Sequence, residues 1–137
     1  MNAPQPEIIP EITDVSRPYW DALAEGRLIY QECRQCGAAW LPPRPQCPQC
    51  LEDAPCWRPS AGMGRVVSWV VYHHAYAAHL EPRIPYDVTI VQLDEGPRLL
   101  TNVVDSAAGR RLSVGARVRL CIETESGTAV ARFRLAE

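Results

Sequence analysis

The chain has 137 residues, of which 47% are hydrophobic, and a formal net charge of −2; this composition suffices for a folded core and excludes wholesale disorder. All 14 basic residues are arginine, which excludes a Schiff base on a lysine of this chain, and the missing basic excess argues against nucleic-acid binding. No apolar run approaches the roughly 20 residues of a membrane span, and residues 1–14 lack a secretory signal pattern, so we expect a cytoplasmic protein.

The first predicted element is a helix near the N-terminus. Residues 1–13 contain prolines and no periodic pattern, so we expect a loose arm there. Ser16 is placed to act as the N-cap of the helix, and Gly26 is placed to end it. The apolar residues that would share one face of this helix are Trp20, Leu23 and Ala24.

Four of the six cysteines form two CxxC pairs, Cys33 with Cys36 and Cys47 with Cys50. In a CxxC turn both sulfurs can face the same point, and Gly37 permits the left-handed backbone that comes after such a turn. Two such turns together form a tetrahedral four-thiolate site with no position left for water, which predicts one structural zinc ion per chain. Four thiolates also suit iron, so the residues alone leave that metal open.

The segment around these cysteines holds few aliphatic residues and many prolines, so it needs the metal in order to fold. We expect a short strand at residues 28–32 and irregular structure at residues 51–61. Gly62 and Gly64 are interpreted as a hinge between this segment and the C-terminal half of the chain.

After the hinge the hydrophobic period changes to two, which is typical of strands. The predicted strands are residues 65–74, 87–94, 98–104, 117–124 and 129–135. Five strands with the longest connection between the third and fourth fit a Greek-key barrel of the OB type, and a small sandwich is the competing architecture. The sequence therefore predicts a mainly β protein with an N-terminal arm and helix (1–26), a zinc ribbon (27–61) and an OB-fold domain (62–137).

The histidines do not form a convincing catalytic set. His73 and His74 are adjacent in a predicted strand and would point to opposite faces, one toward the core and one toward solvent. Cys121 lies far from them in sequence, within a strand pattern where packing is its expected role. We therefore assign no catalytic residues to this chain.

Taken together, these features resemble the rubredoxin-like zinc-ribbon plus OB-fold proteins associated with acyl-CoA enzymes. The resemblance covers nearly everything after residue 14. The segments that carry it are Pro18–Trp20, the two CxxC pairs, Leu41–Arg44, Trp57, Gly62–Gly64, Pro85–Tyr86, Val91–Val104, Gly115 and Arg132–Phe133.

The resemblance implies a non-catalytic accessory or scaffold subunit of a thiolase-fold enzyme that acts on acyl-CoA thioesters. The partner would be a thiolase, a retro-aldolase or an acyltransferase, and it would supply the catalytic residues. This chain would stabilise the partner in a hetero-oligomer and help to form its tunnel for CoA and the acyl group. The alternative is a single-stranded nucleic-acid-binding OB module with a zinc ribbon, which the missing lysines and the net negative charge oppose.

Two sets of residues are candidates for these contacts. The loop at residues 75–86 joins the first two barrel strands, where OB folds commonly bind ligands, although an ordinary solvated loop is an equally open interpretation. The candidate CoA and acyl contacts in the loop are Tyr76, His79, Arg83 and Tyr86. The candidate partner contacts on the helix are Tyr19, Trp20 and Leu23, because aromatic anchors suit docking.

Overall fold

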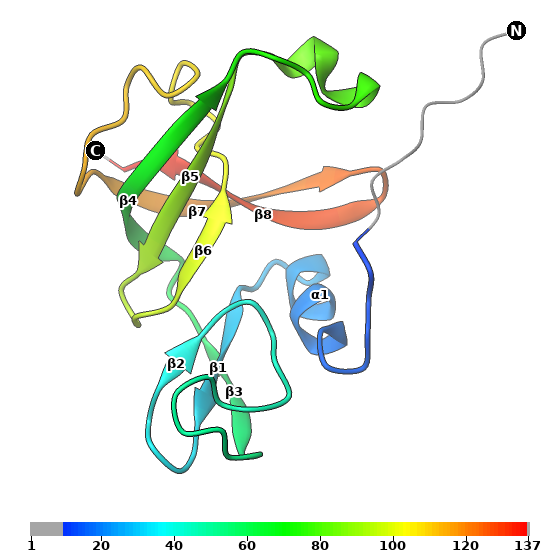
Figure 1. Cartoon of the computed structure of the whole chain (residues 1–137), viewed down its shortest axis with the longest axis vertical. Coiled ribbons are helices and arrows are strands. Elements are labelled where there is room, and N and C mark those ends of the chain that lie inside the picture. The colour runs from blue at the N-terminus through cyan, green and yellow to red at the C-terminus, as the bar shows by residue number, and fades with distance from the viewer. Residues whose placement is uncertain (1–9, 137) are drawn as a thin grey trace, which may run out of the picture.

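In the computed structural model, which describes residues 10–136, the strands fall into two separate sheets (Figure 1). The first sheet has three strands in the order β2-β1-β3, and the second has five in the order β6-β5-β4-β7-β8. The elements are α1 (Arg17–Ala24), β1 (Ile29–Cys33), β2 (Ala39–Trp40), β3 (Pro55–Pro59), β4 (Met63–Tyr72), the 3₁₀ helix η1 (Ala78–Arg83), β5 (Tyr86–Leu93), β6 (Arg98–Thr101), β7 (Arg117–Glu125) and β8 (Thr128–Leu135).

The five-stranded sheet curls into a nearly closed barrel. All neighbouring strands of the sheet pair antiparallel, and a parallel bridge between Val103 and Phe133 connects the segment directly after β6 to β8. The backbone N–H of Val104 donates to the carbonyl of Phe133 at 2.8 Å, and the N–H of Phe133 donates to the carbonyl of Asn102 at 3.1 Å. This strand order confirms the predicted OB-type barrel and excludes the sandwich.

Alternate residues of the barrel strands point into one core. In β5, for example, every second residue from Asp87 to Leu93 is buried, as the period of a strand requires. Phe133 and Val118 are fully buried at the centre, and Leu23 of α1 and Leu28 join the same cluster. The helix therefore packs against β8 and belongs to the barrel's own core (Figure 1).

The helix begins and ends where the sequence predicts, but its first turn and its buried face differ. Ser16 is the N-cap residue, yet its hydroxyl makes no capping bond and instead accepts a hydrogen bond from the N–H of Thr13 at 2.9 Å. Gly26 ends the helix with φ of +85°. Ala24 is exposed, and Ala22 is the alanine buried beside Leu23 in the helix that packs against β8. The predicted arm up to residue 9 lies outside the described residues.

Residues 51–61 are not all irregular, since β3 lies within them. This strand pairs with β1 over its whole length, from Ile29 opposite Pro59 to Cys33 opposite Pro55. Prolines lack an N–H donor but are compatible with an edge strand, particularly at its ends. The two prolines therefore bound a short edge strand, and the expectation of wholly irregular structure here is wrong.

The predicted hinge is wrong at Gly64, which lies inside β4 and is buried, whereas Gly62 lies between β3 and β4 at the boundary of the two sheets. A Cβ atom at Gly64 would lie 2.6 Å from the carbonyl oxygen of Gln92 on β5. The glycine therefore serves the close approach of two strands. Gly62, just before the strand, has φ of +77°, a conformation that favours glycine.

The strand predicted to reach residue 74 ends at Tyr72. His73 and His74 come directly after it and are both exposed, so the expected core-facing histidine is wrong. The connection to β5 contains η1, which the sequence did not predict because Pro82 interrupts any helical pattern. No helix in residues 10–136 is long and apolar enough to cross a membrane.

Candidate metal centre and barrel loop

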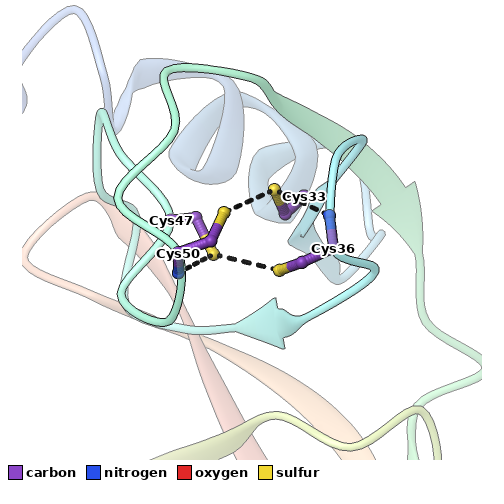
Figure 2. Close-up of side chains that lie close together, drawn as sticks. All are labelled: Cys33, Cys36, Cys47 and Cys50. Atoms are coloured by element: carbon purple, nitrogen blue, oxygen red, sulfur yellow. Dashed lines mark hydrogen bonds between the residues drawn. The ribbon is translucent and has the colours of Figure 1, made fainter.

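The four cysteines of the two CxxC pairs come together between the end of β1 and the connection from β2 to β3 (Figure 2). Their sulfur atoms all lie within 4.8 Å of one another. The Sγ atoms of Cys33 and Cys50 are 3.6 Å apart, as are those of Cys36 and Cys47. Zinc bonded to four sulfurs at about 2.3 Å in a tetrahedron would separate them by about 3.8 Å, so the arrangement fits a metal ion.

The two turns that carry these cysteines have the same local geometry. The sulfur of Cys33 accepts backbone N–H bonds from Gln35 and Cys36 at 3.3 and 3.5 Å. The sulfur of Cys47 accepts them from the second and third residues after it, at 3.3 and 3.4 Å. Gly37 closes the first turn at φ of +79°, and Leu51 closes the second at +65°. The sequence signals the left-handed residue only in the first turn, where it is a glycine.

Burial and backbone donors set the charge of the thiols. Burial of Cys47 opposes its ionisation, but the N–H groups of Cys50 and Gln49 outweigh this and lower its pKa to about 6. At Cys50 the N–H of Glu52 favours the thiolate, yet burial and the neighbouring sulfurs raise its pKa to about 12. Four adjacent thiolates are therefore stable together only around a cation, which a divalent metal ion supplies.

A buried polar contact supports the ribbon beneath the metal site. Trp40 packs against Cys33 and Cys47, and its indole N–H donates to the side-chain oxygen of Gln31 at 2.8 Å. The same oxygen accepts the backbone N–H of Arg44 at 2.6 Å. Gln31 is 3% exposed, and sequence analysis missed its role because a glutamine in a short strand carries no signal of burial.

The predicted ligand loop lies beside an open hollow of about 1210 Å³ between η1, the start of β5 and the β7–β8 hairpin. His79, Arg83 and Tyr86 line this hollow, so the fold brings three of the four candidate residues together. Tyr76 is not among the lining residues; it is 77% exposed and packs edge-on against Tyr72 and His74. Direct CoA contact by any of them stays a prediction.

Arg83 is engaged in an ion pair across the hollow. Its Nη1 atom lies 2.8 Å from Oε1 of Glu125, and Nη2 of Arg132 lies 2.9 Å from the same oxygen. Partial burial opposes the charge of Glu125, but the two guanidinium groups outweigh it and lower the pKa of this carboxyl. Two arginines from distant elements thus converge on one carboxylate, an arrangement that would also suit a phosphate.

The candidate partner residues on α1 are used largely inside the chain. Leu23 is 1% exposed, so its side chain is not available to a partner, and its expected interface role is corrected to core packing. Tyr19 and Trp20 form an edge-to-face pair with ring centroids 5.2 Å apart and pack partly against the same core. Burial raises the pKa of Tyr19 to about 12, against the effect of Arg132. For Tyr19 and Trp20 partner contact stays a prediction.

A rubredoxin-like zinc ribbon joined to an OB-type barrel defines the class of this protein. Two family models match it: the ChsH2 rubredoxin-like zinc ribbon domain over residues 20–55 and the ChsH2 C-terminal OB-fold domain over residues 57–123. A solved chain described as "Ltp2-ChsH2(DUF35) aldolase" superposes with a TM-score of 0.81 and 33% identity, covering 94% of this chain and 100% of that chain. The chain therefore belongs to the ChsH2 (DUF35) family, as the sequence resemblance predicts.

Curated relatives agree with this assignment. A probable enoyl-CoA hydratase alpha subunit of Thermomonospora curvata is 38% identical over 65% of this chain and 27% of the relative. DUF35 domain-containing scaffold proteins are 33% identical in Methanocaldococcus jannaschii, over 57% of this chain and 55% of the relative, and 35% identical in Pyrococcus furiosus, over 66% and 65%. The chain thus spans from about a quarter to two thirds of the length of these relatives.

Proposed function

We propose that this chain is a non-catalytic accessory subunit of a thiolase-fold enzyme that acts on acyl-CoA thioesters. It stabilises the partner subunit and helps to form its tunnel for CoA and the acyl group. The observation that carries the proposal is the likeness to a chain of the Ltp2–ChsH2(DUF35) aldolase over 94% of this chain. The scaffold proteins among its relatives support an accessory role.

The metal centre is better suited to a structural role than to a catalytic one. Four thiolates complete a tetrahedral site and leave no coordination position for water or substrate. When bound, zinc would supply charge compensation and a cross-link between the two CxxC turns, held by Cys33, Cys36, Cys47 and Cys50. In this proposal the chain consists of an N-terminal arm and helix (1–26), a zinc ribbon (27–61) and an OB-fold domain (62–137).

The hollow beside η1 is the proposed side of the CoA thioester. Arg83 and Arg132 place two guanidinium groups there, and exchange of Glu125 for a phosphate would keep both of them paired. Tyr86 lines the same hollow and offers an apolar ring to the acyl or pantetheine chain. In the proposed complex, the four candidate residues of the loop lie near the tunnel: Tyr76, His79, Arg83 and Tyr86.

Reconstitution tests the proposal. The thiolase-fold partner is identified by mass spectrometry of the untagged native complex, purified alone, and assayed with CoA thioesters in the presence and absence of this chain. We expect turnover of the CoA thioester only when the partner is present. We expect full turnover and full stability of the partner only when this chain is present as well. A partner that is equally stable and active alone would refute the accessory role, and turnover by this chain alone would refute the non-catalytic role.

The loop contact is tested in the same assay by Arg83→Ala, with Arg110→Ala as the matched control. Both arginines are exposed, but Arg110 lies on the loop between β6 and β7 and does not line the hollow. We expect Arg83→Ala to raise the KM for the CoA thioester and Arg110→Ala to leave it unchanged. Equal KM values for the Arg83→Ala and Arg110→Ala variants would show that Arg83 does not contact the CoA thioester in the tunnel.

A further inference from the structure

The strand register places a row of arginines on the outer face of the barrel. Arg98 of β6 lies opposite Gln92 of β5, Gln92 opposite Arg65 of β4, and Arg65 opposite Arg117 of β7. Because directly opposed residues point to the same face of a sheet, these side chains lie in one line across four strands. All three arginines of the row are exposed.

A second pair of arginines extends the row. Arg119 is two residues beyond Arg117 on β7, so it points to the same face, and it lies opposite Arg134 of β8. Both are exposed. We call the five residues the arginine band: Arg65, Arg98, Arg117, Arg119 and Arg134. Among the described residues only Arg117 of the band forms an ion pair, so the band carries positive charge that this part of the chain does not compensate.

The same face becomes apolar where it continues beyond Gln92. Ile90 of β5 lies opposite Leu100 of β6, and Val88 lies opposite Val70 of β4. Leu100 is 70% exposed and Val70 is 56% exposed, although both belong to regular strands. Tyr72 lies opposite Tyr86 at the far end, with their rings 5.4 Å apart. An exposed apolar patch of this kind marks an interaction surface.

We infer that this face, the apolar patch together with the arginine band, docks a protein surface on which carboxylates border apolar side chains. The inference rests on the proposed function for the identity of the partner, which would be the thiolase-fold subunit. An apolar centre with an arginine rim is the usual anatomy of a protein interface. Arginine also pairs with carboxylates in a bidentate way that fixes orientation.

The chain contains one example of this recognition. Asp94, in the turn between β5 and β6, accepts two hydrogen bonds from the guanidinium group of Arg117, at 2.7 and 2.9 Å. A carboxylate of the chain itself therefore already pairs with the arginine in the middle of the band, in the geometry that we assign to the partner. Arg65 lies close enough to the same carboxylate to contribute to lowering its pKa.

Nucleic acid is the competing occupant, and the composition of the face opposes it. Single strands are held by aromatic rings that alternate with basic groups, whereas the residues paired in register with the band arginines are Gln92, Met63 and other arginines, with no aromatic ring among them. The tyrosines lie at the opposite end of the face, beyond Val70 and Val88. The formal net charge of −2 also provides no long-range attraction for phosphates.

The test combines a defined probe with the native complex. The ¹⁵N-labelled full chain is titrated with decaglutamate and with deca-thymidylate, and the arginine side-chain N–H signals are followed by NMR. We expect decaglutamate to shift the signals of the arginine band and its affinity to fall with salt. Arg65→Glu with Arg98→Glu should weaken binding by about tenfold or more, and the control Arg110→Glu should leave it unchanged.

In the native complex, we expect the Arg65→Glu, Arg98→Glu double variant to weaken partner binding by about tenfold or more. We expect the same of Leu100→Asp. Circular dichroism confirms that both variants fold. Wild-type affinity for the identified partner in both variants would overturn this inference and leave the accessory role intact. If no thiolase-fold partner accompanies the wild type, the proposed function fails, and decaglutamate binding then decides the inference alone. Preference for deca-thymidylate, or no shift at the arginine band with either probe, would overturn it.

Discussion

The carboxylate of Asp87 in β5 accepts a hydrogen bond from the backbone N–H of Val103 at 2.9 Å. Asp87 is 5% exposed, and its carboxylate also accepts the hydroxyls of Thr89 at 2.5 Å and Ser106 at 3.4 Å. Its own carbonyl accepts the side-chain amide of Asn102. One buried side chain thus ties β5 to the segment that closes the barrel between β6 and β8.

We predict that Asp87→Ala lowers the free energy of unfolding by about 3 kcal/mol, because it leaves a buried N–H and two hydroxyls without their acceptor. The exposed Asp21→Ala is the control and should change stability by less than about 0.5 kcal/mol. Urea unfolding followed by circular dichroism measures both. Equal stabilities for the two variants would show that the buried contacts contribute little.

The second prediction concerns Gly64, whose added Cβ would meet the Gln92 carbonyl oxygen at 2.6 Å and Val91 at 2.9 Å. Since a backbone oxygen cannot move aside, we expect Gly64→Ala to cost about 2–3 kcal/mol. Gly127→Ala is the matched control, because Gly127 has φ of +80° but open space around it, and it should cost only about 1 kcal/mol. Thermal unfolding shows which of the two variants is less stable. A less stable Gly127→Ala would exclude steric contact as the main cause of the loss at Gly64.

Much of the fold and the metal site could be predicted because their signals are local. The spacing of Cys33, Cys36, Cys47 and Cys50 predicts their convergence, and period-two patterning predicts the barrel strands. The contact of Leu23 with the barrel core was not predictable, since it joins elements more than a hundred residues apart. The arginine band was missed because it depends on the pairing register of five strands, which the pattern within each strand does not specify.

A third prediction concerns Glu125, whose folded-state pKa is lowered by Arg83 and Arg132 despite partial burial. A lowered pKa contributes stability that is present above the unfolded value, about 4.3, and is lost as pH falls through the folded value. At pH 7 we expect Glu125→Gln to be less stable than wild type by up to about 1 kcal/mol, a small value because the groups are partly exposed.

The difference between Glu125→Gln and wild type should begin to shrink as pH falls below the unfolded value of about 4.3, and it should reach zero only below the lowered folded-state pKa, where the carboxyl is protonated in both states. Chemical unfolding of both proteins in parallel across this range measures it, and any acid release of metal affects both alike. A stability difference that stays constant between neutral and acidic pH would mean that the ion pairs with Arg83 and Arg132 do not contribute.

The last prediction concerns the metal itself. Elemental analysis of the purified chain should give close to one equivalent of zinc, and an iron content near one would identify the other metal that four thiolates accept. We expect Cys36→Ser to lose the metal and to unfold the ribbon, because removing one thiolate opens the site while few apolar side chains support this segment. Cys56→Ser is the matched control, since its sulfur lies outside the cluster and donates to the Glu32 carbonyl at 3.4 Å. It should keep the metal. Full zinc content in a variant lacking both Cys47 and Cys50 would refute the four-thiolate site.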